Sequence, residues 1–458
     1  MFADTLSSYS DNVAVILADG QALNYRELQQ NVDQFVTELG SPPNKKLIFL
    51  PADNSLASLI AYLACLRQRF PMLLLNPEIN NKWLNQLVNK YRPNGVINTE
   101  HNFPKFVELS NERLELHPDL ALLLSTSGST GTPKQVKLSY QNLEANADSI
   151  IRYLELTSRE RAITSLPMHY SYGLSVINSY LMVGASIVLS QASIVSREFW
   201  NLFKQHNVTS LSGVPYTYET LHRLRFHRMD LPSLNYMTQA GGRLKGELIL
   251  YFAEHMKKQG KRLFVMYGQT EATARIAYVP SAMVDTHPTS IGIAIPGGKL
   301  LLEDNTGREI EQSGQVGELV YYGSNIMMGY ALSLDDLSRG HELQKLKTGD
   351  LARKDESGFF YITGRKTRTL KLFGVRVDLD EVEKRLMEEG WEAFCIGNDK
   401  VMGVAIQSAE FKQPVEQYIT EVLQLHHSVI SVQVISEIPR TSNGKVNYCS
   451  LMELLGCS

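Results

Sequence analysis

The residues best suited to chemistry form a hydroxyl-rich loop from Ser125 to Lys134, which reads STSGSTGTPK. Gly128 and Gly131 allow the backbone to turn tightly and to approach a ligand closely. The hydroxyls and backbone N–H groups of such a loop suit phosphate oxygens, and Lys134 adds a positive charge. The spacing is not the Walker GxxxxGK[ST] pattern, because no Ser or Thr follows the lysine. The alternative is a flexible Ser/Gly linker, which would not normally follow an apolar run such as Leu122–Leu124 directly.

Short motifs with polar ends follow several other apolar runs. Tyr267–Glu271 reads YGQTE, and its carboxylate is a ligand type that Mg²⁺ prefers. Ala240–Gly242 is a small-residue turn, and Thr348–Asp350 reads TGD. In isolation each of these is an ordinary turn, and an aspartate in a turn normally caps the backbone.

Two later motifs carry basic residues. Gly364-Arg365 closes a β-rich segment, and Pro439–Lys445 reads PRTSNGK. Gly444 permits a tight turn that projects Lys445. A lysine in an isolated polar loop is usually a solvated side chain, so the case for Lys445 depends on the other motifs.

Together and in this order, the motifs resemble those of the acyl-adenylate-forming superfamily, which includes acyl-CoA synthetases, stand-alone adenylation domains and luciferases. The resemblance covers nearly the whole chain, since Leu23–Leu28 is similar to the family's N-terminal element. The chain differs from the usual pattern at Ser125, where an aromatic residue is common, and at Gln135, where a glycine usually follows. It also has Thr367 at the hinge position, where Asp or Lys is common.

The resemblance implies a role for each motif in binding ATP and Mg²⁺. The loop would clamp the β- and γ-phosphates, Tyr267 would stack on adenine, Thr270 would bond the α-phosphate and Glu271 would hold Mg²⁺. Asp350 would bind the ribose hydroxyls. The expected nucleotide-binding residues are Thr126, Ser127, Gly128, Ser129, Thr130, Gly131, Lys134, Gly241, Gly242, Tyr267, Gly268, Gln269, Asp350 and Arg365.

Lys445 would neutralise charge between the attacking carboxylate and the α-phosphate, and Arg365 would contact ribose and phosphate. Pro167–Leu174 resembles the segment that borders the acyl pocket, where His169 lies near the acid or gates the thiol tunnel. His169 could equally be a packed histidine beside aromatic residues. The expected catalytic residues are Lys445, Glu271, Thr270 and His169, and the expected pocket residues are His169, Tyr172, Gly173, Val214, Pro215 and Ala240.

The implied activity is that of an ATP-dependent carboxylic acid ligase, which forms an acyl-AMP, releases pyrophosphate and transfers the acyl group to a thiol, with coenzyme A as the expected acceptor. A separate acyl or peptidyl carrier protein with phosphopantetheine, or an amine, stays open as the acceptor. No acidic residue lies between Ser165 and Leu181, which disfavours a free α-amino acid and favours a small to medium acyl or aryl acid. A non-catalytic sensor predicts loss of Lys445, Glu271 or Asp350, and all are present.

The elements that must position these residues alternate between short apolar runs and amphipathic stretches, which indicates an α/β fold with packed βαβ sheets. We expect a large N-terminal domain at 1–365, with a β-barrel-like subdomain at about 292–360. A small, mobile α+β domain would follow at 366–458. The expected strands of the large domain are Lys46–Leu50, Met72–Leu75, Ala162–Ser165, Ser186–Leu189, Ser210–Ser212, Tyr236–Gln239 and Leu263–Tyr267.

Composition excludes several other classes of protein. The 458 residues are 43% hydrophobic and 20% charged with a formal net charge of −3, which gives no general attraction to nucleic acid. The most apolar stretch, Leu47–Leu66, contains Pro51 and Asp53 and therefore predicts a strand and a buried helix, not a membrane span. The start lacks a secretory signal, and the 4 cysteines lack metal-ligand spacing. We expect a cytoplasmic enzyme.

Overall fold

The computed structural model describes the chain apart from some short segments. These are 41–43, 80, 101–102, 126–133, 373–374, 399, 424–425, 442–443 and 457–458. The described residues form two compact units. The first lies within Met1–Ser127, Pro133–Lys299 and Tyr322–Leu346, and the second lies within Leu300–Tyr321 and Lys347–Ser458. The predicted boundary between 365 and 366 falls inside the second unit and stays a prediction.

One large sheet of the first unit has nine strands among the described residues, in the order β15-β14-β13-β12-β11-β9-β10-β1-β2. Strands β1, β10, β9, β11, β12 and β13 run parallel, and antiparallel strands close both edges. The strands are β1 (Val13–Ile16), β2 (Ala22–Asn24), β9 (Arg161–Ile163), β10 (Ser186–Val188), β11 (Ser210–Gly213), β12 (Tyr236–Gln239), β13 (Arg262–Tyr267), β14 (Ala277–Val279) and β15 (Ile293–Ala294).

The second large sheet of this unit has seven described strands in the order β18-β8-β7-β4-β3-β5-β6. Strands β7, β4, β3 and β5 are parallel, and β8 joins them antiparallel to β7. The strands are β3 (Ile48–Pro51), β4 (Met72–Leu75), β5 (Gly95–Asn98), β6 (Lys105–Glu108), β7 (Leu120–Ser125), β8 (Gln135–Ser139) and β18 (Gly329–Ala331).

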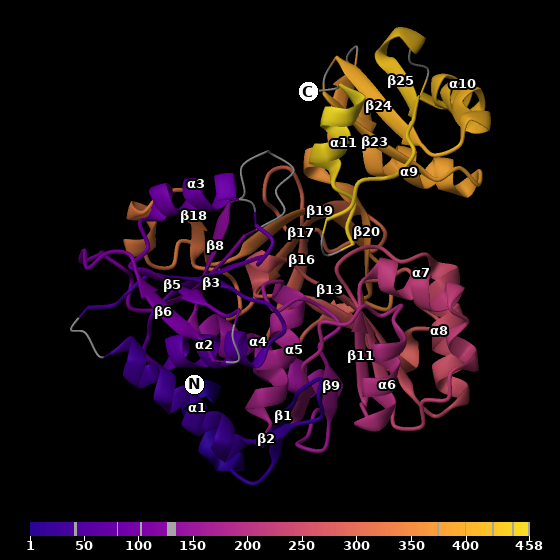
Figure 1. Cartoon of the computed structure of the whole chain (residues 1–458). Helices are drawn as coiled ribbons and strands as arrows, with labels where there is room; N and C mark the ends of the chain where they lie inside the picture. The colour runs from indigo at the N-terminus through magenta and orange to yellow at the C-terminus, as the bar shows by residue number, and fades with distance from the viewer. Residues whose placement is uncertain are drawn as a thin grey trace. The chain divides into compact units, whose positions relative to one another are not determined.

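Two helices link these sheets (Figure 1). Helix α4 (Tyr140–Leu154) packs on β7 and β8, α5 (Ser171–Met182) packs on β9 and β10, and the two helices pack on each other. The resulting layers confirm the predicted α/β class. The other helices of this unit are α1 (Tyr25–Leu39), α2 (Leu56–Arg67), α3 (Asn81–Tyr91), α6 (Arg197–Gln205), α7 (Pro215–Arg223) and α8 (Gly246–Lys258).

Local sequence explains where these helices begin and how deeply they lie. The LNYREL element is a helix start, since the Asn24 side chain accepts from the Glu27 N–H and the Glu27 carboxylate accepts from the Asn24 N–H, both at 2.8 Å. Helix α2 is apolar on every side and almost wholly buried, as the Leu47–Leu66 stretch predicts. Within the described residues, every helix is too short or too polar to cross a bilayer.

The second unit begins with a four-stranded sheet in the order β16-β17-β19-β20, which contains the strands predicted as a small β-rich subdomain. Strands β15 and β18 come from the same Gly-punctuated stretch but belong to the two large sheets. The strands of the four-stranded sheet are β16 (Lys299–Glu303), β17 (Val316–Tyr322), β19 (Leu346–Lys354) and β20 (Phe360–Arg365).

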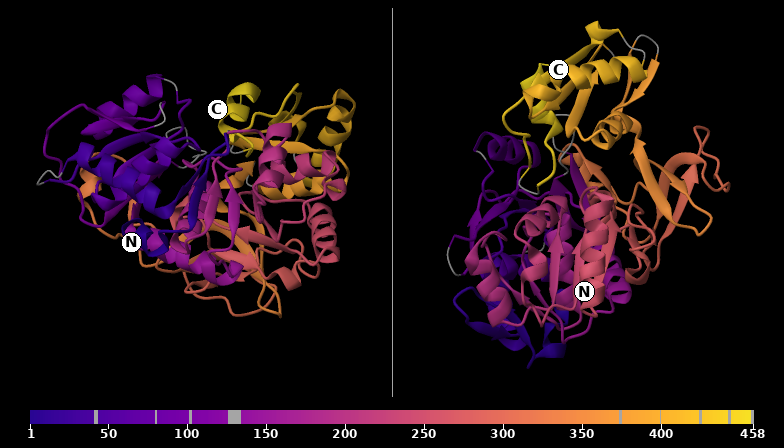
Figure 2. Two further views of the ribbon diagram at one scale, coloured as in Figure 1. Left: turned by 60° about the horizontal axis from the view of Figure 1, so that its bottom comes forward. Right: turned by 90° about the vertical axis from the view of Figure 1, so that its right-hand side faces the viewer.

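The rest of the second unit is a small α+β body, seen from two sides in Figure 2. Alternate residues of its three-stranded sheet face two cores: Cys395 packs with α9 and α10, and its neighbour Ile396 packs with α11. The elements are β21 (Thr369–Leu372), β22 (Val375–Asp378), α9 (Leu379–Glu388), β23 (Ala393–Asn398), β24 (Val401–Ile406), α10 (Lys412–Leu423), β25 (Ile430–Val434) and α11 (Tyr448–Leu455).

Candidate active site

The predicted pocket segments follow four adjacent parallel strands of the nine-stranded sheet. The order β13-β12-β11-β9 places the ends of these strands next to one another. Tyr267 ends β13, Ala240 follows β12, Val214 follows β11, and His169 lies in the turn after β9. In open α/β sheets, ligands bind outside the carboxyl ends of parallel strands. The fold therefore collects these segments at the edge of the sheet where a ligand is expected.

A chain of hydroxyl groups connects these strand ends. The Tyr172 hydroxyl on α5 donates to the Thr238 carbonyl at 2.9 Å and lies 2.8 Å from Thr238 Oγ1. Thr238 Oγ1 donates to Ser212 Oγ at 2.9 Å, and Ser165 Oγ donates to the Ser212 carbonyl at 2.6 Å. Tyr172, Thr238 and Ser212 are buried, so these hydrogen bonds satisfy polar groups that have left water. They fix α5 to the ends of β9, β11 and β12.

Two glycines of these segments are required by close backbone packing. A Cβ on Gly173 would lie 2.3 Å from the Pro167 carbonyl oxygen, and one on Gly268 would lie 1.7 Å from the Ala274 carbonyl oxygen. Both distances are far inside van der Waals contact, so no other residue fits without a backbone shift. The predicted Gly241 and Gly242 follow β12, and the Gly242 carbonyl accepts from the Gln239 side chain at 3.0 Å.

The YGQTE motif forms the turn after β13. The Gln269 side chain donates to the Tyr267 hydroxyl at 3.2 Å, and Thr270 Oγ1 lies 3.4 Å from Ser171 Oγ at the start of α5. The hydroxyl of Tyr330 donates to Glu271 Oε1 at 2.8 Å. This hydrogen bond orients the carboxylate that the sequence assigned to Mg²⁺.

Tyr330 also connects Glu271 with Lys134, the lysine of the predicted phosphate loop. The Lys134 ammonium lies 5.3 Å from the centroid of the Tyr330 ring, within cation–π range. Tyr330 reaches this position because β18 pairs with β8, which sets Tyr330 opposite Val136. No motif indicated Tyr330, because its role depends on the pairing of strands that are far apart in sequence.

The two residues that depart from the family pattern beside the phosphate loop bond to each other. Ser125 and Gln135 are register partners on β7 and β8, and Ser125 Oγ donates to Gln135 Oε1 at 2.9 Å. Gln135 is fully buried. The predicted loop residues between them lie outside the described residues: Thr126, Ser127, Gly128, Ser129, Thr130 and Gly131.

His169 is held in one tautomer. Its Nδ1 lies 3.0 Å from the Ala52 carbonyl oxygen, which can only accept, so Nδ1 carries the proton. Burial lowers the pKa of the His169 imidazole, against the opposing effect of this hydrogen bond. Its Nε2 is buried without a hydrogen-bond partner among the described residues. His169 is therefore a neutral side chain at pH 7 with an acceptor lone pair on Nε2.

In the second unit, the TGD and GR motifs meet across two paired strands. Asp350 on β19 is opposite Arg365 on β20, and Arg365 Nε donates to Asp350 Oδ1 at 2.6 Å. Thr348 Oγ1 donates to the Leu319 carbonyl at 2.8 Å and accepts from the Asp350 N–H at 3.1 Å. The two residues predicted for the ribose therefore form one ion pair across two paired strands.

Lys445 lies in the tight turn predicted from its sequence. The Thr441 N–H donates to the Lys445 carbonyl at 2.7 Å, and Gly444 has a φ of +74°. The Arg440 side chain donates to the Gly444 carbonyl at 3.1 Å and helps to close the turn. Ser442 and Asn443 lie outside the described residues.

A partly buried charge cluster that sequence reasoning missed supports the same small body. Arg368 Nη2 donates to Glu383 Oε1 at 2.6 Å, and Arg368 Nη1 is 2.6 Å from Asp380 Oδ1. The Tyr448 hydroxyl donates to Glu383 at 3.2 Å. Burial raises the pKa of the Glu383 carboxyl, although the Arg368 guanidinium acts in the opposite direction. The cluster joins the first turn after β20 to α9 and α11.

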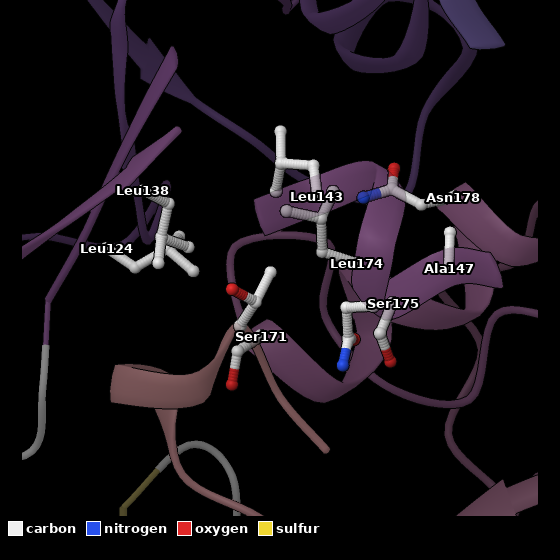
Figure 3. Close-up of a pocket in the computed structure, with 10 residues that line it drawn as sticks. Leu124, Leu138, Leu143, Ala147, Ser171, Leu174, Ser175 and Asn178 are labelled. Atoms are coloured by element: carbon white, nitrogen blue, oxygen red, sulfur yellow. The ribbon is translucent and has the colours of Figure 1, made fainter. Parts of the chain in front are cut away.

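A crevice lies between the second large sheet and the helices α4 and α5 (Figure 3). It has no room for a water molecule, and none of the six predicted pocket residues lines it. It approaches the YGQTE turn through Ser171 and Thr273. Its lining residues are Leu124, Leu138, Leu143, Asn146, Ala147, Ser171, Leu174, Ser175, Asn178 and Thr273.

Glu271 is the carboxylate that the family resemblance assigns to a metal. No group of three or more His, Cys, Asp or Glu side chains in the described residues forms a metal site. A site with a single carboxylate does not suit zinc, which takes three or four protein ligands. It does fit Mg²⁺, which commonly binds one or two carboxylates together with substrate phosphates and water.

Comparisons with known proteins show which enzymes this chain is similar to. A long-chain-fatty-acid–CoA ligase of Escherichia coli is 28% identical over 349 residues, which cover 74% of this chain and 60% of the ligase. The chain thus spans less than two thirds of the length of that relative. A 2-succinylbenzoate–CoA ligase of Bacillus pumilus is 25% identical over 82% of this chain and 80% of that protein.

The fold is also that of a solved structure. The O-succinylbenzoate coenzyme A synthetase of Bacillus subtilis, in complex with AMP, superimposes with a TM-score of 0.79 and 21% identity over 97% of this chain and 96% of the other. The family model described as AMP-binding enzyme matches residues 2–331, which is most of the chain. This chain therefore belongs to the family of AMP-binding enzymes.

Proposed function

We propose that the protein is an ATP-dependent carboxylic acid ligase that forms an acyl-AMP and then transfers the acyl group to coenzyme A. One observation carries this proposal. Tyr267, Thr270 and Glu271 lie together with the α5 segment at the carboxyl ends of β9, β11, β12 and β13. The names of the relatives support it, since each is a ligase that joins a carboxylic acid to coenzyme A.

In the first step, an oxygen of the acid attacks the α-phosphorus of ATP, and the bond to the pyrophosphate oxygen breaks. Thr270 Oγ1 would hold the α-phosphate, and Lys134 with the loop hydroxyls would hold the leaving pyrophosphate. Glu271 would bind Mg²⁺, which neutralises charge on the phosphates. Lys445 would stabilise the charge that develops between the carboxylate and the α-phosphate, a contribution that depends on accurate positioning. Asp350 and Arg365 would hold the ribose.

In the second step, the sulfur of the acceptor thiol attacks the acyl carbonyl carbon, and AMP leaves. A neutral His169 adds no positive charge beside the acid, and its Nε2 lone pair can accept a hydrogen bond from the thiol. We keep the domain boundary at 366 and a rotation of the small body between the two steps as part of the proposal. The buried thiols Cys65 and Cys395 suit a reducing compartment, which supports a cytoplasmic location.

Product analysis tests the complete reaction. The enzyme is incubated with MgATP, a panel of acids, and either coenzyme A or a phosphopantetheine-loaded carrier protein, and the products are identified by mass spectrometry. The proposal expects AMP and an acyl-CoA in equal amounts. Acyl transfer to the carrier protein alone would assign the acceptor differently, and formation of ADP instead of AMP would contradict the proposal.

A further inference from the structure

A buried arginine next to the predicted acyl pocket has no carboxylate partner in the part of the chain that the structure describes. Arg275 is only 2% exposed, and it ranks among the largest fully buried side chains described. Within the described residues, no Asp or Glu carboxylate approaches its guanidinium to 4.0 Å. Its Nε is buried without a hydrogen-bond partner among those residues. Burying a charge without a partner costs several kcal/mol of folding free energy, so a bound anion would stabilise the Arg275 guanidinium.

Tyrosine side chains contact this guanidinium but carry no negative charge that would neutralise it. It lies 4.0 Å from the centroid of the Tyr172 ring. Its positive charge opposes the rise in pKa that burial causes at Tyr172, Tyr170 and Tyr153. A desolvated cation–π contact contributes roughly 2 kcal/mol, which is less than the cost of burying an unpaired charge.

The backbone before Arg275 is strained and firmly held. Thr273 and Ala274 have φ values of +61° and +136°, which non-glycine residues rarely adopt. Asn325 fixes this turn, because its side chain donates to the carbonyls of Ala272 and Arg275, each at 2.8 Å, and its own carbonyl accepts from Thr273 Oγ1 at 2.7 Å. Strain of this kind persists where the surrounding structure requires one geometry. Here that geometry sets Arg275 against Tyr172.

The position of Tyr172 relates Arg275 to the reaction. Tyr172 follows Ser171, whose hydroxyl lies 3.4 Å from Thr270 Oγ1, the proposed α-phosphate ligand. The Tyr172 hydroxyl also bonds to Thr238, just before the Ala240 turn. A substrate group beside the Tyr172 ring would therefore lie within reach of the guanidinium while the reacting carboxylate lies near Thr270.

We propose that Arg275 is a specificity-determining residue that binds a second anionic group on the acid, so that the preferred substrates are dicarboxylic or similarly acidic compounds activated at one end. This inference rests on the proposed function and narrows its substrate class. A buried positive charge also disfavours an ammonium group, in agreement with the absence of acidic residues between Ser165 and Leu181. A charge-assisted pair with a carboxylate supplies both affinity and orientation.

The test compares acids that differ only in the second charge, using exchange of labelled pyrophosphate into ATP. The pairs are hexanoate with hexanedioate, octanoate with octanedioate, and benzoate with 1,3-benzenedicarboxylate. We expect at least one diacid to show kcat/KM about tenfold or more above its partner in the wild-type enzyme. Arg275→Met should remove this preference by lowering diacid kcat/KM about 30-fold or more while leaving the monoacid nearly unchanged. Arg275→Lys should retain part of the preference.

Three outcomes would overturn the inference. The first is a wild-type enzyme that activates only monoacids. This result requires no variant, and it would leave the proposed adenylation reaction in place. The second is equal loss of both acid classes in an Arg275→Met protein that still binds MgATP and melts cooperatively, which would assign Arg275 to the reacting carboxylate or to the fold. The third is the absence of exchange with any acid despite ATP binding, which would contradict the proposed function itself.

Discussion

Removal of the Tyr330 hydroxyl should weaken the use of Mg²⁺ without changing the position of Lys134, the lysine proposed to bind phosphate. In Tyr330→Phe the ring remains beside Lys134 at the 5.3 Å seen here, but the 2.8 Å hydrogen bond to Glu271 Oε1 is lost. A hydrogen bond to a charged acceptor contributes about 1.5–3 kcal/mol. Loss of a residue that orients a metal ligand typically costs about 10–100-fold in metal affinity or activity. We therefore expect the Mg²⁺ concentration for half-maximal activity to rise about tenfold, or about 1.4 kcal/mol.

The assay is acid-dependent pyrophosphate exchange at saturating ATP and acid, titrated with Mg²⁺. Tyr278→Phe is the matched control, because the Tyr278 hydroxyl makes no hydrogen bond in the described part of the chain while its ring stacks on Tyr153. The Tyr330→Phe enzyme should recover most of its rate at high Mg²⁺, with the KM for the acid within about twofold of the wild type. An unchanged Mg²⁺ titration with a raised KM for the acid would refute the assignment of Tyr330 and Glu271 to the metal.

Further perturbations test other parts of the site. Because burial lowers the pKa of His169, the neutral form stabilises the fold fully above pH ~6.5, and this contribution is lost as the pH falls from there toward the folded pKa. Between pH 7 and pH 5, the free energy of unfolding in urea should fall less steeply for His169→Gln than for the wild type, by up to about 1.4 kcal/mol per pH unit. Parallel plots of unfolding free energy against pH for the two proteins would contradict this. Gly268→Ala should reduce pyrophosphate exchange more than ~100-fold, whereas Gly260→Ala, with nothing within 4 Å of the new Cβ, should cost only about 1 kcal/mol of stability and no activity. Glu383→Ala should lower the unfolding free energy of the second unit by about 1.5–3 kcal/mol, since Arg368 loses its charge-assisted hydrogen bonds to Glu383 and keeps only Asp380 as a partner, and a change below ~1 kcal/mol in thermal or urea melts would show that water replaces the carboxylate. Lys445→Ala should abolish adenylation but spare thiol attack on a preformed acyl-adenylate, and equal loss of both half-reactions would contradict its proposed role.

Local patterns in the sequence predicted much of the scaffold. The strands at Met72–Leu75 and Tyr236–Gln239 match the prediction residue for residue, because each is a short run bounded by turn residues. β9 ends at Ile163 and not at the predicted Ser165. The Thr164 hydroxyl donates to the Ser190 carbonyl and that of Ser165 to the Ser212 carbonyl, which draws these residues out of the strand.

The parts of the site that sequence did not predict depend on contacts between distant segments. Tyr330 meets Glu271 only because β18 joins the edge of a sheet formed from the first part of the chain. Ser125 and Gln135 are single departures from a motif in sequence, yet in the fold they are one hydrogen-bonded pair. Arg275 resembles any other basic residue until its burial and its missing carboxylate are known. Hydrophobic periodicity and short sequence motifs carry no information on which distant segments contact one another.

Isotope exchange without any acceptor measures whether this chain adenylates a carboxylic acid. Labelled pyrophosphate is mixed with MgATP, the enzyme and each acid in turn, with no coenzyme A present. Label should enter ATP only when a suitable acid is added, and Glu271→Gln and Lys445→Ala should both suppress this exchange. Binding of ATP without acid-dependent exchange across a broad panel of mono- and dicarboxylic acids would contradict the proposed adenylation.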